Sequence, residues 1–159
     1  MINIQAIYDK EKIINGKFSK KYNYSDPDIF YKQVLELIVE LSELAYETKC
    51  FKYWKNDKPS SAEITIAEYA DCLMIALSLC DLANIQINNL PKVEEENIVK
   101  QFIKLNYLAS QVTIELDQNL LLEILSNLLN LSKLLKFTDK ELEEYCELKM
   151  NKTLAMISE

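Results

Sequence analysis

Apolar residues recur every three to four positions along most of the chain, the spacing that places them on one face of an α-helix. The pattern is weak over residues 1–13 and clear over 28–50, 61–84, 93–114, 118–136 and 138–156. One glycine and three prolines offer little material for the tight turns of β-hairpins. The sequence therefore predicts an all-α helical bundle of about five helices, and we expect residues 1–159 to form a single domain.

Residues with oxygen-bearing side chains stand just before three of the predicted helices, where they can accept a hydrogen bond from a free backbone N–H. The candidate caps are Ser25 or Asp26, Ser60 or Ser61, and Thr138. Pro27 suits the first turn of the first of these helices, and Glu141 completes a capping-box pattern in the last. The segments 14–28 and 51–60 are predicted to be connections.

A row of acidic residues runs along the otherwise apolar stretch 34–47. Its members are Glu36, Glu40, Glu43 and Glu47. At about 100° per residue they fall within a strip about 60° wide, which no lysine shares. A solvated helix face is normally wider and mixes lysine with glutamate. The strip is therefore interpreted as a row of acids inside a helical bundle, with a solvated face as the alternative.

The next predicted helix carries a second acid pair, Glu68 and Asp71, which lie on one face because they are three residues apart. Nine uncharged residues follow, which indicates a helix surrounded by protein. Carboxylates about 4 Å apart repel by about 4 kcal/mol per pair at an effective dielectric constant of about 20, so a cation is expected between them. Oxygen ligands without imidazole or paired thiolates favour Mg²⁺ or Mn²⁺.

The composition excludes several kinds of chemistry. Without histidine there is no Ser-His or Cys-His pair, no histidine-ligated zinc and no di-iron site of the Glu-x-x-His type. A single glycine excludes a glycine-rich phosphate loop. The formal charge of -7 argues against a nucleic-acid partner, whose phosphates need a basic surface. Carboxylates and lysines must carry most of any catalysis.

The cysteines and the apolar stretches bear on location. Cys50, Cys72, Cys80 and Cys146 show no C-x-x-C spacing, and three of them lie within apolar helical pattern. This usage is typical of reduced, buried thiols in a cytoplasmic protein. The most apolar stretches are short or are interrupted by polar residues, so we expect neither a membrane span nor a membrane partner.

The two acid pairs resemble a known signature. Glu40-x-x-Glu43, followed after 24 residues by Glu68-x-x-Asp71, is similar to the metal-binding motif of the all-α nucleoside triphosphate pyrophosphohydrolases, the MazG-like superfamily. More narrowly, "VELSELAYETKCFKYW" and "IAEYADCLMIALSL" resemble the type 2, dimeric dUTPase family, over residues 34–83. The resemblance implies hydrolysis of dUTP, and of dUDP as well, to dUMP, with a metal-activated water attacking the α-phosphate.

The resemblance also implies roles for individual residues. Carried over position by position, it gives Glu40, Glu43, Glu68 and Asp71 as ligands of magnesium ions. Glu47 is then the catalytic residue, as a further ligand or as the group that orients the attacking water. This agrees with the physics of the site, because a spare carboxylate can accept the proton of a water whose pKa a metal has lowered.

Residues after the first acid pair are candidates for binding the nucleotide. Trp54, with Phe51, lies on the connection where the resemblance implies contact with the nucleoside, and a ring there can stack on the base. Lys52 and Lys55 can approach phosphate oxygens. The alternative is that the rings close the end of the bundle and that the lysines are solvated.

The C-terminal stretch "YCELKMNKT" loosely resembles a further segment of the family. On that basis Lys149 and Asn151 are candidate contacts to the nucleotide.

The sequence departs from the family pattern at three positions. Cys72 and Met74 stand where the family tends to have glycine and histidine, and Tyr46 replaces a common asparagine. The choice of base is therefore open. One alternative function is a MazG-like pyrophosphohydrolase for another nucleotide, such as dCTP. Another is a catalytically silent helical dimer that binds a nucleotide or a protein.

The stretch 118–136 holds more leucine than a small bundle easily buries. Five of its leucines lie near one side: Leu121, Leu125, Leu128, Leu131 and Leu135. We expect this stripe to be exposed and to form the contact of a homodimer, in accord with the family. The alternative is that the stripe belongs to the core of the single chain.

Overall fold

The computed structural model describes residues 1–115 and 118–158, and these residues form α-helices and no strand. The helices are α1 (Ile4–Phe18), α2 (Pro27–Thr48), α3 (Ala62–Leu82), α4 (Ile98–Ser110), α5 (Gln118–Leu134) and α6 (Asp139–Ile157). The all-α prediction is confirmed. Residues 116, 117 and 159 of the expected domain lie outside the described residues. Within the described part, no helix is both long and apolar enough to cross a membrane.

Three helices begin where the sequence predicted, because their caps are local. The side chain of Asp26 accepts a hydrogen bond of 2.9 Å from the backbone N–H two residues later. Ser61 caps α3 in the same way at 3.4 Å. Thr138 and Glu141 form the reciprocal bonds of a capping box at the start of α6. The caps of α2 and α3 are therefore Asp26 and Ser61 rather than Ser25 and Ser60.

The bounds of α1 and α4 differ most from the predicted ones, and α4 ends at Ser110 rather than 114. Helix α1 extends to Phe18, although the pattern predicted a connection from residue 14, because Ile14 and a polar residue, Asn15, continue its buried face. Helix α4 begins at Ile98 rather than 93, since Asn97 accepts a hydrogen bond of 3.1 Å from the N–H of Lys100 and caps the helix there. A polar residue on the buried face thus hid the end of α1, and a polar cap sets the later start of α4.

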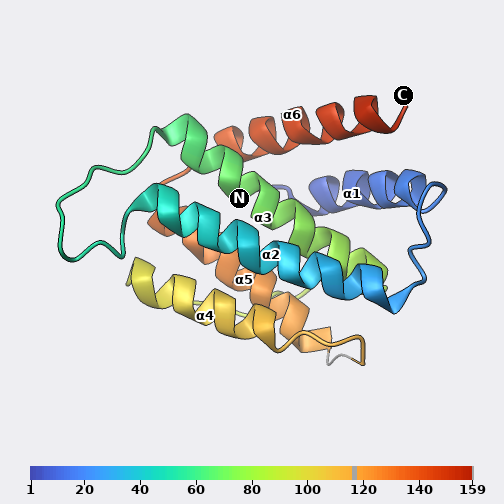
Figure 1. Cartoon of the computed structure of the whole chain (residues 1–159), viewed down its shortest axis with the longest axis horizontal. Helices are drawn as coiled ribbons and strands as arrows, with labels where there is room; N and C mark the ends of the chain where they lie inside the picture. The colour runs from blue at the N-terminus through green and yellow to red at the C-terminus, as the bar shows by residue number, and fades with distance from the viewer. Residues whose placement is uncertain (116–117, 159) are drawn as a thin grey trace.

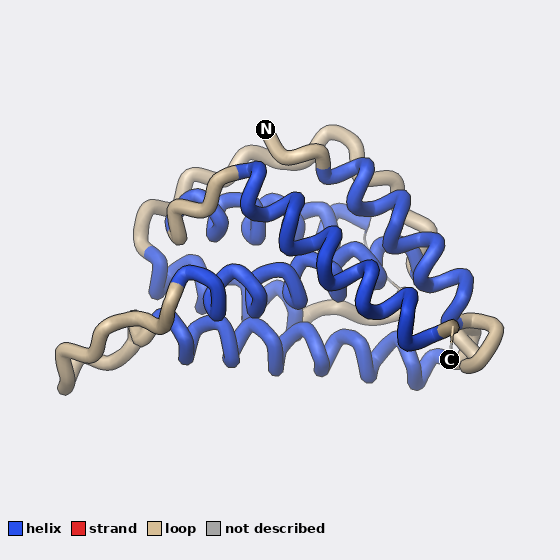
Figure 2. The backbone as a smooth tube through the Cα atoms, turned by 90° about the horizontal axis from the view of Figure 1, so that it is seen from above, coloured by secondary structure: helices blue, strands red, loops and turns tan. Residues whose placement is uncertain are grey.

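Helix α3 lies at the centre of the fold and packs against α1, α2, α5 and α6 (Figure 1). Helices α2 and α3 run antiparallel, and the connection 49–61 between them projects beyond one end of the helices (Figures 1 and 2). Helix α4 packs against α2 and α5, and α6 packs against α1 and α3. The acidic residues predicted on α2 and α3 therefore come from neighbouring helices.

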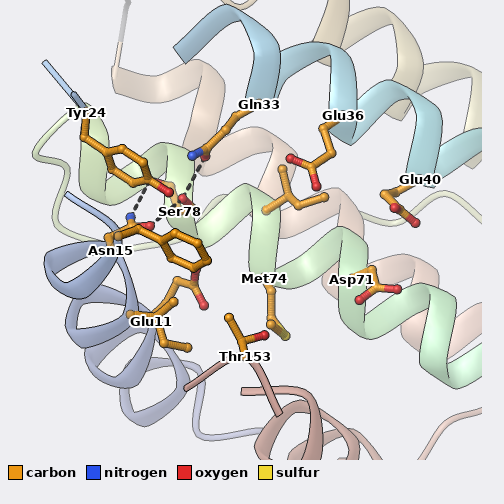
Figure 3. A pocket seen from close by; sticks show the side chains of 13 residues that line it. Glu11, Asn15, Tyr24, Gln33, Glu36, Glu40, Asp71, Met74, Ser78 and Thr153 are labelled. Atoms are coloured by element: carbon orange, nitrogen blue, oxygen red, sulfur yellow. Dashed lines mark hydrogen bonds between the residues drawn. The ribbon is translucent and has the colours of Figure 1, made fainter. Parts of the chain in front are cut away.

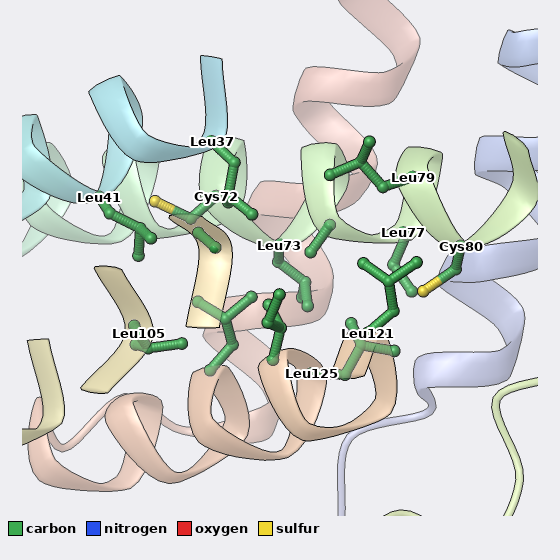
Figure 4. Close-up of a cluster of buried hydrophobic side chains, with 14 of the residues drawn as sticks. Leu37, Leu41, Cys72, Leu73, Leu77, Leu79, Cys80, Leu105, Leu121 and Leu125 are labelled. Carbon is green, nitrogen blue, oxygen red and sulfur yellow. The ribbon is translucent and has the colours of Figure 1, made fainter. Parts of the chain in front are cut away.

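The core is a leucine-rich layer between α2 and α3 on one side and α4 and α5 on the other (Figure 4). Four leucines of the predicted stripe on α5 are fully buried in it: Leu121, Leu125, Leu128 and Leu131. Leu135 is partly buried against the same core. The prediction that this stripe is exposed is wrong, because α3 and α4 cover the apolar face of α5. The alternative, an intramolecular core, is confirmed.

The cysteines are free thiols, as the sequence predicted. Cys72, Cys80 and Cys146 are buried within the core, and Cys50 is partly exposed. Burial raises the pKa of the Cys80 and Cys146 thiols to about 12, so both remain protonated. These side chains act as small apolar residues in packing.

Candidate functional site

Three carboxyl groups from α2 and α3 converge at the middle of the helix pair. Glu40, Glu68 and Asp71 each offer one oxygen atom, and these atoms lie within 4.8 Å of one another. Because α2 and α3 run antiparallel (Figure 1), Glu40 of α2 comes to lie beside Glu68 and Asp71 of α3. Three of the four predicted metal ligands are therefore together in the structure.

The electrostatics of this cluster show that its charges are not balanced. Burial, and after it the charges of Asp71, Glu43 and Glu68, together raise the pKa of Glu40 to about 7. Burial and the charges of Asp71 and Glu43 also raise the pKa of Glu68. One oxygen of Glu40 is buried without a hydrogen-bond partner. Mutual repulsion and an unpartnered oxygen are what a site for a divalent cation offers, so the cluster can hold one.

A lysine from α6 supplies part of the compensating charge. The Nζ atom of Lys149 lies 2.5 Å from a carboxylate oxygen of Asp71, and both side chains are partly buried. The charge of Lys149 also opposes the rise in the pKa of Glu68. The structure thus places Lys149 at the acid cluster, while Asn151, two residues later, is exposed.

The other two predicted acids lie further along α2. Glu43 is exposed and does not join the cluster of three, although its charge acts on both Glu40 and Glu68. Glu47 lies about 10 Å further along the helix axis than Glu40. Its carboxylate accepts a hydrogen bond from the hydroxyl group of Ser60, which fixes the side chain beside the start of α3.

The connection between α2 and α3 carries the predicted aromatic and basic residues. Phe51 is 41 % and Trp54 61 % exposed, and the Trp54 ring contacts the rings of Phe51 and Tyr53. Lys52 and Lys55 both pair with Asp57, at 2.8 and 3.4 Å. Because both rings are exposed, they do not close the end of the bundle, and a ligand could contact them.

A pocket of about 370 Å³ adjoins the acid cluster and lies between α1, α2 and α3, with Thr153 of α6 also in its lining (Figure 3). The acidic end of the pocket is formed by Glu36, Glu40 and Asp71. Burial and the charge of Asp71 raise the pKa of Glu36. The far end is formed by Glu11, Asn15, Gln33 and Ser78. The pocket thus leads from the candidate cation site toward α1.

Hydrogen bonds between three helices hold the far end of the pocket. The hydroxyl oxygen of Ser78 lies 2.7 Å from Oε1 of Gln33 and 3.0 Å from Oδ1 of Asn15, so the hydroxyl group can donate to either. The Asn15 amide donates to a carboxylate oxygen of Asp81 at 3.0 Å. Because these bonds tie α1, α2 and α3 together, this wall of the pocket is well defined.

Glu11, in the same wall of the pocket, is not part of this hydrogen-bond network. Its side chain is 5 % exposed, and one carboxyl oxygen has no hydrogen-bond partner. Burial, and secondarily the charge of Asp81, raise the pKa of Glu11 to about 8. The carboxyl group is therefore mostly protonated at neutral pH.

The raised pKa of Glu11 makes stability depend on pH. The folded protein keeps a proton on Glu11 that the unfolded chain releases above its ordinary pKa, so stability should fall as pH rises from about 5 to about 8. The contribution of this group is at most about 1.4 kcal/mol per pH unit. Urea unfolding of the metal-free protein across this range should show a shallower slope for Glu11→Gln than for the wild type. Equal slopes would mean that Glu11 is ionised in the folded protein.

The residues at the far end of the pocket were not predicted as site residues. Their signal in the sequence is a polar residue at a buried helical position: Glu11 and Asn15 are four apart on α1, and Ser78 lies in the uncharged run after Asp71.

The structure also shows where the three departures from the family pattern lie. Met74 lines the pocket, whereas Cys72 is fully buried and Tyr46 is not among the described lining residues.

Acid pairs on two antiparallel helices, beside a polar pocket within an all-α bundle, are the arrangement expected of an all-α nucleotide pyrophosphohydrolase. A family model described as dUTPase matches residues 3–153, which includes α1 and the pocket as well as both acid pairs. The chain belongs to the dUTPase family and is a dUTP diphosphatase-like hydrolase. No curated protein and no solved structure matches it.

Proposed function

We propose that the protein hydrolyses dUTP, and dUDP as well, to dUMP with Mg²⁺ as its cation. The observation that carries this proposal is the convergence of Glu40, Glu68 and Asp71 at the acidic end of a pocket, in a chain that belongs to the dUTPase family. A triphosphate needs positive charge at its phosphates, which a cation held at the acidic end of the pocket would supply. Its base needs an uncharged environment, which the far end of the pocket would provide.

The proposed cation ligands are Glu40, Glu68 and Asp71, with Glu43 as a fourth from the exposed side. An all-oxygen donor set suits Mg²⁺, and Mn²⁺ as a substitute. When bound, the cation would offset the charge of the phosphate oxygens and lower the pKa of the attacking water. Glu40 must lose its proton to act as a ligand, so we expect cation binding to strengthen as pH rises through about 7.

Other residues of the chain would position the water and the phosphates. We assign the orientation of the water that attacks the α-phosphate to Glu47, whose carboxylate is held by Ser60. Lys149, which neutralises Asp71 in this structure, would be free to pair with a phosphate oxygen once Asp71 binds the cation. We propose that Lys52 and Lys55 add positive charge from the connection.

The nucleobase is proposed to occupy the far end of the pocket. Asp71 and Ser78 lie seven residues apart on α3, which corresponds to about 10 Å along the helix axis, a length that suits a sugar and a base. The volume of about 370 Å³ is at the small end of the range for ligand pockets, which favours a pyrimidine. We also propose contacts between the nucleotide and three residues that do not line this pocket, namely Phe51, Trp54 and Asn151.

The test is release of pyrophosphate or phosphate from a set of nucleotides with Mg²⁺. We expect dUTP to be hydrolysed with the highest kcat/KM, dUDP to be accepted, and chelation of the metal to abolish turnover. A preference for dCTP would favour the second candidate function, a MazG-like pyrophosphohydrolase for another base. Met74 at the pocket supports that candidate, since it stands where the family tends to have histidine. Absence of all turnover would favour the silent binding module.

A homodimer is also proposed, through a face that differs from the stripe on α5. Exposed apolar residues form one line on α2 and a second line on the adjacent α4. The face consists of Tyr31, Leu35, Val39 and Tyr46 with Val99, Ile103 and Tyr107. The hydroxyl group of Tyr31 accepts a hydrogen bond of 3.2 Å from the N–H of Ile114, which joins α2 to the segment after α4. An apolar face of this kind on two packed helices suits a second copy of the chain.

Replacing Ile103 by glutamate should convert the dimer to a monomer, because the substitution buries a charge at the centre of this face. Light scattering after size-exclusion chromatography would measure the mass. Leu148→Glu is the matched control, since Leu148 is also exposed, at 49 %, but lies on α6. The proposal fails if the wild type is monomeric at micromolar concentration or if both variants remain dimeric.

We also propose that residues 1–159 act as one cytoplasmic domain. The free thiols suit a reducing compartment. The formal charge of -7 disfavours a nucleic-acid partner.

A further inference from the structure

Two buried carboxyl oxygens without a hydrogen-bond partner lie at opposite ends of the same pocket. One belongs to Glu40, in the acid cluster, and the other to Glu11, at the far end. Buried polar atoms are normally partnered, so each of these oxygens is available to a group that a ligand brings. The oxygen of Glu40 is accounted for by the proposed cation. The oxygen of Glu11 has no role in the function described so far.

The surroundings of Glu11 do not suit a second cation. The charge of Asp81 from α3 acts on Glu11, and the charge of Glu11 acts in turn on Cys146 from α6 and on Tyr24 from the connection before α2. Asp81 is already engaged by the amide of Asn15. Within the described residues, the cluster of acids with the geometry of a metal site is the one at Glu40, not one at Glu11. An uncharged partner with hydrogen-bonding groups is the better occupant.

We propose that Glu11 acts as a neutral carboxylic acid that recognises the edge of a pyrimidine base, donating its O–H to an acceptor on the base and accepting a hydrogen bond from the adjacent N–H. This inference rests on the proposed function, because it requires a nucleotide in the pocket. It makes Glu11 a determinant of substrate class, at the end of the pocket opposite the cation ligands.

The donor and acceptor pattern of a neutral carboxyl group fits both common pyrimidines. With uracil, the O–H donates to a ring carbonyl oxygen and the carboxyl C=O accepts the N3–H. With cytosine, the O–H donates to N3 and the C=O accepts from the exocyclic amino group. An ionised carboxylate can only accept, and it would repel the base acceptor. Glu11 therefore sets the preference for the pyrimidine edge and its dependence on pH, but does not separate uracil from cytosine.

The raised pKa of Glu11 agrees with this role. Burial keeps the carboxyl group protonated at neutral pH, and a base that accepts a hydrogen bond from its O–H would favour the neutral form further. A glutamine at position 11 offers a donor and an acceptor in the same places but does not titrate in this range. A leucine offers neither.

The kinetic test compares Glu11→Gln and Glu11→Leu with the wild type, using dUTP and Mg²⁺ from about pH 7 to about pH 9.5. For the wild type, KM should rise about tenfold per pH unit above the pKa of Glu11, while kcat follows the acid cluster. For Glu11→Gln, KM should stay low across the range. For Glu11→Leu, KM should be at least tenfold higher at pH 7 with kcat largely kept.

A second measurement detects the proton directly. Calorimetric titration of the wild type with dUMP at about pH 8.5, in buffers of different ionisation enthalpy, should show uptake of a proton fraction on binding. The number of protons taken up by the Glu11→Gln variant should be lower by the fraction that Glu11 contributes in the wild type. A purely structural role for Glu11 would alter unfolding in these variants without moving KM or the proton count.

The possible outcomes separate the two proposals. If dUTP or dCTP is hydrolysed but KM and its pH dependence are the same in all three proteins, the role of Glu11 is refuted and the proposed function stands. If no nucleotide is hydrolysed or bound, both are refuted. If Glu11→Leu does not fold, Glu11→Gln still decides, because a wild-type-like rise of KM with pH in that variant contradicts the inference.

Discussion

Replacing Glu40 by glutamine is expected to lower kcat for dUTP by about 100-fold to 1,000-fold while making the metal-free protein more stable. The amide cannot supply the negative charge that a divalent cation requires, so turnover with Mg²⁺ is lost. At about pH 8 the same change removes a charge that Asp71, Glu43 and Glu68 repel. Relief of about 1 kcal/mol would raise Tm by about 2–4 °C for a chain of this length.

The matched control for this prediction is Glu63→Gln. Glu63 is exposed in the first turn of α3, five residues before Glu68, so its replacement should change neither kcat nor Tm appreciably. Steady-state kinetics with Mg²⁺ and thermal unfolding without it give the two readouts. An unchanged kcat for Glu40→Gln would remove Glu40 from the proposed cation ligands, and a lower Tm would mean that the cluster is not repulsive.

Replacing Leu125 by alanine should destabilise the protein by about 3–5 kcal/mol, because the side chain is fully buried in the core formed by α3, α4 and α5. The loss combines the transfer of the leucine out of the core with the cavity that remains. Urea unfolding measures it, and the destabilisation should not depend on protein concentration, since Leu125 is internal to one chain.

Leu35→Ala provides the contrast, as Leu35 is 62 % exposed on α2. Its effect on the unfolding of the monomer should be below about 1 kcal/mol, with any larger change confined to the dimer. If Leu125→Ala behaved like Leu35→Ala, the leucines of α5 would not form the core. The pair of variants therefore tests where the apolar faces of this bundle are covered.

Helix positions and the acid cluster could be predicted because they depend on local rules. The 3.6-residue period located five helices, and the capping residues located the starts of α2, α3 and α6 within a residue. The spacing of Glu68 and Asp71 places them on one face of α3 in any structure where that segment is helical. Their approach to Glu40 was predicted from the presence of acid pairs on two consecutive helices.

The pocket and the covering of α5 could not be predicted in the same way. A helical pattern shows which face is apolar but not which helix covers it, so the stripe that includes Leu121 and Leu125 was assigned to a partner rather than to α3 and α4. Glu11 and Asn15 interrupt the apolar period of α1, so the pattern alone made that helix look weak. Only the packing of α1 against α3 shows that these polar side chains line a pocket.

The three clustered carboxylates all come from one helical hairpin, α2 and α3, joined by the connection 49–61. Contacts within one hairpin close a shorter loop than contacts between distant helices and so cost less entropy, which favours their early formation. The repulsion among these acids must then act on the hairpin before the remaining helices have packed. Folding with Mg²⁺ present should therefore be faster than folding without it, if the ion binds the hairpin while the rest of the chain is still assembling.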